Sequence, residues 1–203
     1  MLRILSTTFI ALVAALTLGV TPASADRLPP LMLGPGDAGV SDLGGQAIIR
    51  YSKFGPVYIS GQHNQHLTVK YVESKQSIRF RDTNTGSFKG GLPDRCFREK
   101  VKKGVSAVCK IPPRFRDGKM FIQVWPRLGN DFTDGRSLPA KFRMWVLTDA
   151  GNDVTLLGDG ADFVNGAKGN DRISGGNGND WLRGGPGGDN IIGGGGKDRI
   201  AHG

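Results

Sequence analysis

Three consecutive segments of nine residues decide the fold: Gly-Ala-Lys-Gly-Asn-Asp-Arg-Ile-Ser at 166–174, Gly-Gly-Asn-Gly-Asn-Asp-Trp-Leu-Arg at 175–183 and Gly-Gly-Pro-Gly-Gly-Asp-Asn-Ile-Ile at 184–192. Each segment has glycine at its first and fourth positions, aspartate at its sixth and a large aliphatic residue at its eighth. Self-similarity at a fixed period is typical of repeat architectures, in which each unit buries its apolar face against its neighbours.

The same period continues on both sides of these segments, over residues 149–203. Its aspartates are Asp153, Asp162, Asp171, Asp180, Asp189 and Asp198. The residues two positions after them are Thr155, Val164, Ile173, Leu182, Ile191 and Ile200. A disordered glycine-rich linker is the alternative interpretation, but a linker has no reason to keep aspartate in phase with an aliphatic residue.

The pattern G-G-x-G-x-D-x-U-x, in which U is a large aliphatic residue, resembles the hemolysin-type or RTX-like calcium-binding repeat of exported bacterial proteins. The resemblance covers residues 149–203 and implies a parallel β-roll of six nonapeptides. Two units then make one coil of eighteen residues, with the aliphatic side chains pointing inward and alternate aspartates on opposite sides. One side carries Asp153, Asp171 and Asp189, and the other carries Asp162, Asp180 and Asp198.

Stacked coils bring like charges together on each side of the predicted roll. Neighbouring strands lie about 4.8 Å apart, and two carboxylates at that distance repel by roughly 1–3 kcal/mol. A calcium ion between two turns removes this repulsion, because calcium accepts six to eight oxygen ligands in flexible geometry. The predicted ligands are the six aspartates and backbone carbonyls near Gly160, Gly169, Gly178 and Gly187.

The two columns have room for up to about four calcium ions. The first and last units depart from the pattern, at Thr155 and at Lys197. A core one side chain thick is too thin to fold unaided, so we expect the roll to be unfolded without calcium and to fold on binding.

Residues 1–25 are predicted to be a secretion signal. Arg3 is followed by an apolar run over 4–20, and Ala23-Ser24-Ala25 supplies the small residues that a signal peptidase accepts. A membrane anchor is the alternative, but the run is short for a span and no basic cluster follows it immediately. No later segment is apolar enough to cross a bilayer, so we expect a secreted, extracellular product cleaved after Ala25. Residues 26–46, rich in proline and glycine, are expected to be a flexible leader.

Residues 47–148 are predicted to form a small all-β domain. Short segments alternate apolar and polar residues between turn formers, over 47–51, 57–60, 66–72, 77–80, 105–110, 120–124 and 142–147. Cys96 and Cys109 are an even pair in an exported chain, which predicts one disulfide. The segment Gly129-Asn130-Asp131 resembles one more repeat turn, but it precedes Asp153 by 22 residues, which is not a multiple of nine.

Charge is divided between the two regions. Residues 26–148 carry 21 Lys and Arg against 10 Asp and Glu, whereas residues 149–203 carry 5 against 8. The basic excess is either an ordinary solvated surface or a site for anionic cell-envelope polymers or lipids. Its densest part, over 79–103, includes interleaved phenylalanines as nucleic-acid binders can, but an exported chain is not expected to bind nucleic acid.

Nothing in the sequence predicts an enzyme. His63 and His66 lie on opposite faces of an extended segment, and there is no His-Glu-x-x-His, Gly-x-Ser-x-Gly or phosphate-binding motif. The prediction is a non-enzymatic, secreted calcium-binding protein. The alternative is a calcium-stabilised adhesin or envelope-binding protein that uses the basic domain.

Overall fold

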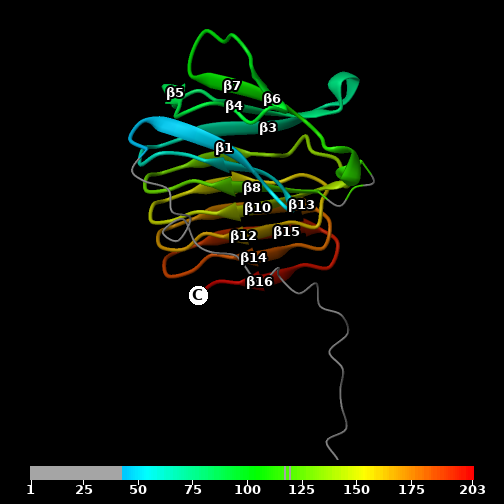
Figure 1. Ribbon diagram of the computed structural model, residues 1–203. Coiled ribbons are helices and arrows are strands. Elements are labelled where there is room, and N and C mark those ends of the chain that lie inside the picture. The colour runs from blue at the N-terminus through cyan, green and yellow to red at the C-terminus, as the bar shows by residue number, and fades with distance from the viewer. Residues whose placement is uncertain (1–42, 117, 119) are drawn as a thin grey trace, which may run out of the picture. The chain divides into compact units, whose positions relative to one another are not determined.

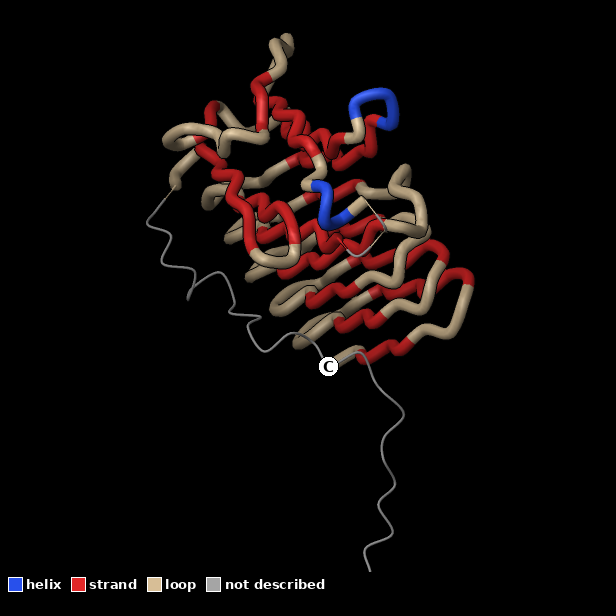
Figure 2. The backbone as a smooth tube through the Cα atoms, turned by 45° about the vertical axis from the view of Figure 1, so that its right-hand side comes forward, coloured by secondary structure: helices blue, strands red, loops and turns tan. Residues whose placement is uncertain are grey.

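The computed structural model describes residues 43–116, 118 and 120–203, so the predicted signal peptide and most of the predicted leader lie outside the described residues. Within this part of the chain, helical structure is limited to two short 3-10 segments, Glu73–Lys75 and Pro113–Phe115 (Figure 2). Nearly all other regular structure is β, which confirms the predicted all-β class. No helix among these residues is long and apolar enough to span a bilayer.

The described residues form two eight-stranded sheets (Figure 1). The strands of the first sheet are β1 (Gln46–Ser52), β2 (Gly55–Ile59), β5 (Ser87–Phe88), β8 (Met120–Trp125), β10 (Phe142–Leu147), β12 (Phe163–Asn165), β14 (Trp181–Arg183) and β16 (Arg199–Ala201). Those of the second are β3 (His66–Val72), β4 (Ser77–Asp82), β6 (Cys96–Arg98), β7 (Val105–Lys110), β9 (Phe132–Asp134), β11 (Val154–Leu156), β13 (Arg172–Asn177) and β15 (Asn190–Gly195). Their orders are β16-β14-β12-β10-β8-β2-β1-β5 and β15-β13-β11-β9-β3-β4-β7-β6.

The C-terminal part is the predicted parallel β-roll. The chain passes alternately between the sheets, and each strand pairs in parallel with the strand one coil earlier. Trp181 pairs with Arg199 in the first sheet, and Arg172 pairs with Asn190 in the second, so one coil contains eighteen residues. The turns bend tightly because glycines supply positive φ angles, such as +123° at Gly178.

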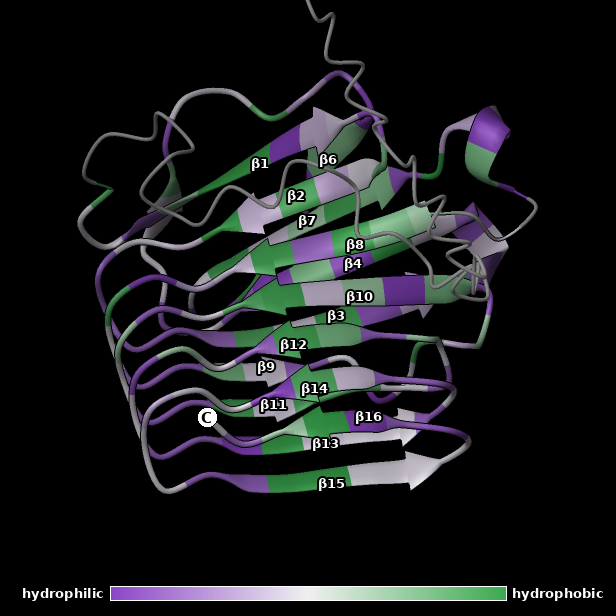
Figure 3. Ribbon diagram, turned by 90° about the horizontal axis from the view of Figure 1, so that it is seen from below, coloured by the Kyte–Doolittle hydropathy of each residue, from purple (hydrophilic) through white to green (hydrophobic). Residues whose placement is uncertain are grey.

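A single layer of side chains fills the space between the two sheets of the roll. Val164, Ile173 and Leu182 are almost completely buried and belong to one apolar cluster that continues into the N-terminal strands through residues such as Phe142. Figure 3 shows hydrophobic residues recurring along the stacked strands. Burying an aliphatic side chain of this size contributes about 1.5–3 kcal/mol. The layer is open at the last coil, where Ile200 is 44% exposed.

Mainly antiparallel strands close the N-terminal end of the stack. Strands β3, β4, β7 and β6 pair in that order, and β1 and β2 form a hairpin. Each of the seven strand segments predicted before the repeats lies largely within an observed strand, whereas the short β5, β6 and β9 were not predicted. The predicted disulfide between Cys96 and Cys109 is present and joins β6 to β7.

Strand pairing in both sheets continues across residue 148, where the predicted domain boundary lies. Strand β10 pairs in parallel with β8 and β12, and β9 pairs in parallel with β3 and β11. Parallel stacking therefore begins before the first predicted repeat. The division into domains at 47–148 and 149–203 stays a prediction. Leu43, near the end of the predicted leader, is buried against Val57 and Ile59.

Candidate metal centre

Asp153, Asp171 and Asp189 lie in one column, called here the first column, on the turns that precede β11, β13 and β15. The backbone N–H of Asp153 donates to Asp171 Oδ1 at 2.9 Å, and that of Asp171 donates to Asp189 Oδ1 at 3.0 Å. The carboxylates of Asp171 and Asp189 therefore extend toward the turn eighteen residues earlier. The Oδ2 atom of all three side chains is buried without a hydrogen-bond partner.

Asp162, Asp180 and Asp198 lie in a second column on the other side of the roll. The backbone N–H of Asp162 donates to Asp180 Oδ1 at 2.8 Å, and that of Asp180 donates to Asp198 Oδ1 at 3.0 Å. Asp162 Oδ1 accepts a bond from the N–H of Met144, which occupies the equivalent position one coil earlier. Asp180 Oδ2 is buried without a partner, as in the first column.

Burial raises the pKa of the Asp153, Asp162, Asp171 and Asp180 carboxyl groups, and like charge in each column raises it further. The pKa values of Asp153 and Asp180 are raised to about 6, and the pKa of Asp171 is raised above its usual range. The pKa of Asp162 is raised well above its usual range. Ionised carboxylates in these columns are therefore costly unless a cation neutralises them.

In the first column, a carboxylate oxygen and a carbonyl oxygen converge beside Gly166, between the turns 166–171 and 184–189. A Cβ atom placed on Gly166 would collide with Asp171 Oδ2 and would lie 2.6 Å from Gly184 O. A carboxylate oxygen and a carbonyl oxygen therefore both approach the Gly166 backbone closely, because residue 166 has no side chain. This arrangement is called the Gly166 cradle below.

The second column repeats this arrangement half a coil later. A Cβ atom placed on Gly175 would collide with Asp180 Oδ2 and would lie 2.6 Å from Gly193 O. This is the Gly175 cradle, between the turns 175–180 and 193–198. The two cradles are related by one nine-residue step, so the spacing of the sequence accounts for their recurrence.

Calcium fits the donor atoms of the cradles. It binds carboxylate and carbonyl oxygens, and the buried Oδ2 atoms have no other partner. Among the described residues there is no group of three or more His, Cys, Asp or Glu side chains that could hold a metal. Backbone carbonyls or water would therefore have to complete the ligand shell.

The comparison with known families agrees with this geometry. Residues 145–173, 156–191 and 174–203 match the model of the RTX calcium-binding nonapeptide repeat, in four copies. The C-terminal region carries RTX repeats. RTX repeats of this kind bind calcium in general, and their β-roll is a structural calcium-binding fold. Neither the curated proteins nor the solved structures gave a match to the chain.

The carbonyl groups predicted as ligands, near the glycine at the fourth position of each RTX unit, face a different part of the neighbouring turn. A Cβ atom on Gly178 would collide with Gly160 O, and one on Gly187 would collide with Gly169 O. These predicted carbonyls therefore pack against the glycine of the next turn on the same side, where a side chain has no room. Their role as ligands stays a prediction, and the carbonyls beside the carboxylates are those of Gly184 and Gly193.

The first column extends beyond the residues that match the RTX model. The N–H of Asp131 donates to Asp153 Oδ1 at 2.8 Å, and the N–H of Gln65 donates to Asp131 Oδ1 at 2.7 Å. Asp131 is 2% exposed, its Oδ2 has no partner, and burial raises its pKa to about 8. The segment Gly129-Asn130-Asp131 thus stacks in register with the RTX turns. The 22-residue spacing arises because the chain from β9 to β10 is four residues longer than that from β11 to β12.

A ladder of asparagines lies beside the first column, one residue before each of its members. The N–H of Asn130 donates to Asn64 Oδ1, that of Asn152 to Asn130 Oδ1 and that of Asn170 to Asn152 Oδ1, each at 2.8 Å. Gly188 N–H donates to Asn170 Oδ1 at 2.7 Å. The sequence analysis did not identify this ladder, although the Asn-Asp pairs were its visible signal. It joins the N-terminal strands to the RTX turns in one register.

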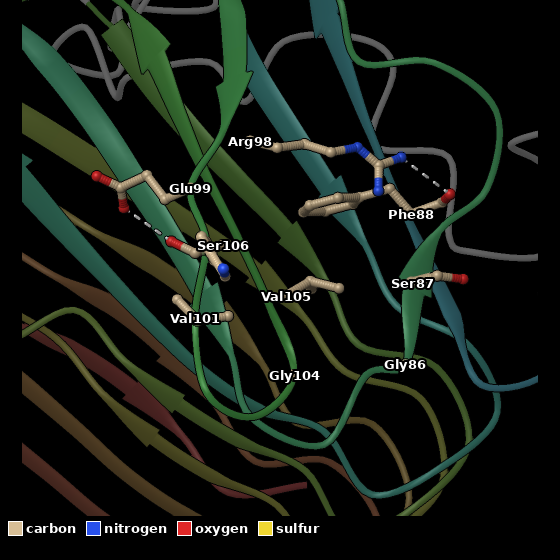
Figure 4. A pocket seen from close by; sticks show the side chains of 10 residues that line it. Gly86, Ser87, Phe88, Arg98, Glu99, Val101, Gly104, Val105 and Ser106 are labelled. Carbon is tan, nitrogen blue, oxygen red and sulfur yellow. Dashed lines mark hydrogen bonds between the residues drawn. The ribbon is translucent and has the colours of Figure 1, made fainter.

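A separate cavity of about 220 Å³ lies beside β5 and β7 (Figure 4). The Arg98 guanidinium lies 5.4 Å from the centre of the Phe88 ring. The Glu99 carboxylate accepts a hydrogen bond from Ser106 at 2.9 Å and pairs with Arg79 at 2.7 Å. The hydrogen bond from Arg79 lowers the pKa of Glu99, so this carboxylate is a weak base.

His63, in the segment between β2 and β3, and His66, in β3, have separate partners. His63 Nε2 lies 3.2 Å from Thr85 Oγ1, and the ring of His66 packs against Phe132 at 4.4 Å between centres. They therefore do not form a shared metal site.

Proposed function

We propose that this protein is a secreted, non-enzymatic calcium-binding protein whose RTX roll holds calcium ions between its turns. The observation that carries the proposal is the pairing, in the Gly166 and Gly175 cradles, of a buried carboxylate oxygen that has no partner with a carbonyl oxygen of the following turn. Magnesium suits these cradles less well, because it requires a tight octahedron and retains its waters.

Each cradle has candidate ligands from two turns. Asp171 with the Gly184 carbonyl would hold one ion in the first column. Asp180 with the Gly193 carbonyl would hold one in the second. Asp189 and Asp198 place a further carboxylate against each of these turns, through the bonds that their Oδ1 atoms accept. The calcium ion would supply the positive charge that these closely spaced carboxylates lack.

Calcium binding is proposed to drive folding of the roll. At neutral pH the metal-free columns hold buried carboxylates whose raised pKa values report a cost of ionisation. An ion that binds the folded roll and not the unfolded chain stabilises the fold. Extracellular calcium-binding modules have dissociation constants of about 10⁻⁴ to 10⁻³ M, which suits filling after export. RTX proteins are typically exported, which supports the predicted signal over 1–25.

Calorimetric titration of the chain from residue 26 onward with calcium chloride tests the proposal. We expect Asp171→Asn and Asp180→Asn each to lose one bound ion, because each substitution removes the carboxylate of one cradle. Asp159→Asn is the matched control, since Asp159 lies in a turn of the same roll but is exposed. Far-UV circular dichroism should show strand structure that is lost in chelator and regained with calcium. A wild-type chain that retains no calcium after dialysis against millimolar calcium would refute the proposal.

Binding to anionic envelope polymers or lipids is a second candidate function, favoured by the surface around β6. Its exposed basic residues are Arg95, Arg98, Lys100, Lys102, Lys103 and Lys110. Phe97 is 53% exposed among them, with the Lys110 ammonium 5.4 Å from its ring centre. Salt-sensitive retention on purified cell envelope would support this role, and no retention at low salt would dismiss it.

A further inference from the structure

The turn that carries Asp153 does not have a glycine at its first position, whereas the Gly166 cradle does. Thr148 stands eighteen residues before Gly166 and is 4% exposed. Thr148 Oγ1 donates a hydrogen bond to Gly166 O, which is the counterpart, one coil earlier, of Gly184 O in the cradle. The same hydroxyl lies 3.2 Å from Asn165 O.

The Thr148 hydroxyl also lies beside the carboxylate of its own turn. Burial raises the pKa of Asp153, and the neighbouring Thr148 hydroxyl opposes part of that shift. The carbonyls of Asn165 and Gly166 and the carboxylate of Asp153 therefore all lie near Thr148 Oγ1. The same kinds of oxygen would coordinate a calcium ion. A hydroxyl has one proton and no net charge, so it can satisfy one acceptor fully, and Asp153 Oδ2 stays without a partner.

We propose that the Thr148 side chain occupies, between the turns 148–153 and 166–171, the position that a calcium ion takes in the Gly166 cradle, and that it excludes an ion there. The inference rests on the proposed function, because it takes the Gly166 cradle to be a calcium site. The residue at the first position of each turn then determines whether that turn binds metal.

The second column shows a related difference in its first turn. Leu157 stands eighteen residues before Gly175, and it is 2% exposed and packed in the apolar cluster. The turn that carries Asp162 therefore also lacks the first-position glycine. Calcium would be confined to the later turns, and the chain would bind fewer ions than the spacing of its six aspartates allows.

Calcium titration of first-position variants tests this inference. Thr148→Gly removes the side chain and leaves Asp153 and Gly166 O beside a glycine, as Asp171 Oδ2 and Gly184 O lie beside Gly166, so we expect it to bind one ion more than the wild type. Thr148→Val is the matched control, because it keeps the volume and removes the hydroxyl, and it should bind the wild-type number.

The converse variant closes an existing cradle. Gly166→Thr should bind one ion fewer than the wild type, because its side chain would enter the space beside Asp171 Oδ2. Gly166 does not have a positive φ angle, but an added Cβ would lie 2.6 Å from Gly184 O, so the neighbouring turn must shift to accept the side chain. Far-UV circular dichroism in calcium shows whether each variant has a folded roll.

The two proposals fail in different ways. A wild type that binds no calcium refutes the proposed function. A wild type that binds calcium, with Thr148→Gly folded and binding the same number, overturns the present inference alone. A lower number in Thr148→Gly would overturn it as well, because the hydroxyl would then be a ligand. If Thr148→Gly does not fold, Gly166→Thr decides, and an unchanged number there overturns the inference.

Discussion

Truncation of Leu182 to alanine tests whether the roll depends on its single layer of apolar side chains. Leu182 is fully buried at the centre of β14, between Val164 of β12 and Ile200 of β16. The substitution removes three carbon atoms, each worth about 0.8 kcal/mol of burial. A residual cavity of roughly 50 Å³ adds about 1 kcal/mol, since no second layer of side chains lies behind to close it. We therefore expect the free energy of unfolding to fall by about 3 kcal/mol.

The matched control is Ile200→Ala, which truncates the same position of a later RTX unit. Ile200 is 44% exposed, so its truncation removes little burial and should cost about 1 kcal/mol or less. Urea unfolding followed by far-UV circular dichroism, at saturating calcium, measures both losses. Equal losses in the two variants, or a loss below about 1 kcal/mol for Leu182→Ala, would show that the layer does not carry the stability assigned to it.

Three further outcomes are expected. At saturating calcium, Asp131 should lower the free energy of unfolding by roughly 4 kcal/mol between pH 4 and pH 7, because its pKa is raised to about 8 in the folded state, so its contribution is complete below its unfolded pKa and is lost as pH rises toward 8; urea titrations of the wild type and of Asp131→Asn would contradict this by showing the same pH dependence. Replacing Cys96 and Cys109 by serine should cost about 2–4 kcal/mol and leave the number of bound calcium ions unchanged, as thermal unfolding and calorimetry would report. Gly178→Ala should destabilise the roll by more than 1 kcal/mol, because Gly178 has a φ of +123° and its Cβ would collide with the turn one coil earlier; Gly91→Ala, with nothing within 4 Å of the added Cβ, should be near neutral in the same unfolding assay.

The roll was predictable because its period is strict and local. The nine-residue recurrence fixed the coil length, the two columns and the inward position of residues such as Ile173 and Leu182. The short strand β6 was not predicted, because three residues are too few to show alternation. Its place is fixed by pairing of Cys96 with Cys109 on the neighbouring strand.

The N-terminal extension of the first column could not be predicted from spacing alone. Asn64 and Asn130 are 66 residues apart, and their hydrogen bond depends on how the intervening strands fold. The four additional residues between β9 and β10 also conceal the register of Asp131 in the sequence. The sequence did not indicate the role proposed for Thr148 either, because in the sequence Thr148 is only a repeat position at which glycine is absent. Stacking of the coils brings its hydroxyl against Gly166 O.

The first turns have Thr148 and Leu157 at the first position, and the later turns have glycine there. This difference implies that removal of metal unfolds the roll from its C-terminal end. In a stack whose units contact only their neighbours, stability is set unit by unit. Strands β11 and β12 follow the turns that Thr148 and Leu157 close without metal, and they stack on the N-terminal strands through β9 and β10. Strands β15 and β16 follow turns with first-position glycines and lie at the open end of the core. We therefore expect chelator at pH 7 to accelerate hydrogen exchange in β15 and β16 before β11 and β12. Simultaneous loss of protection in all four strands would mean that the turns share one metal dependence.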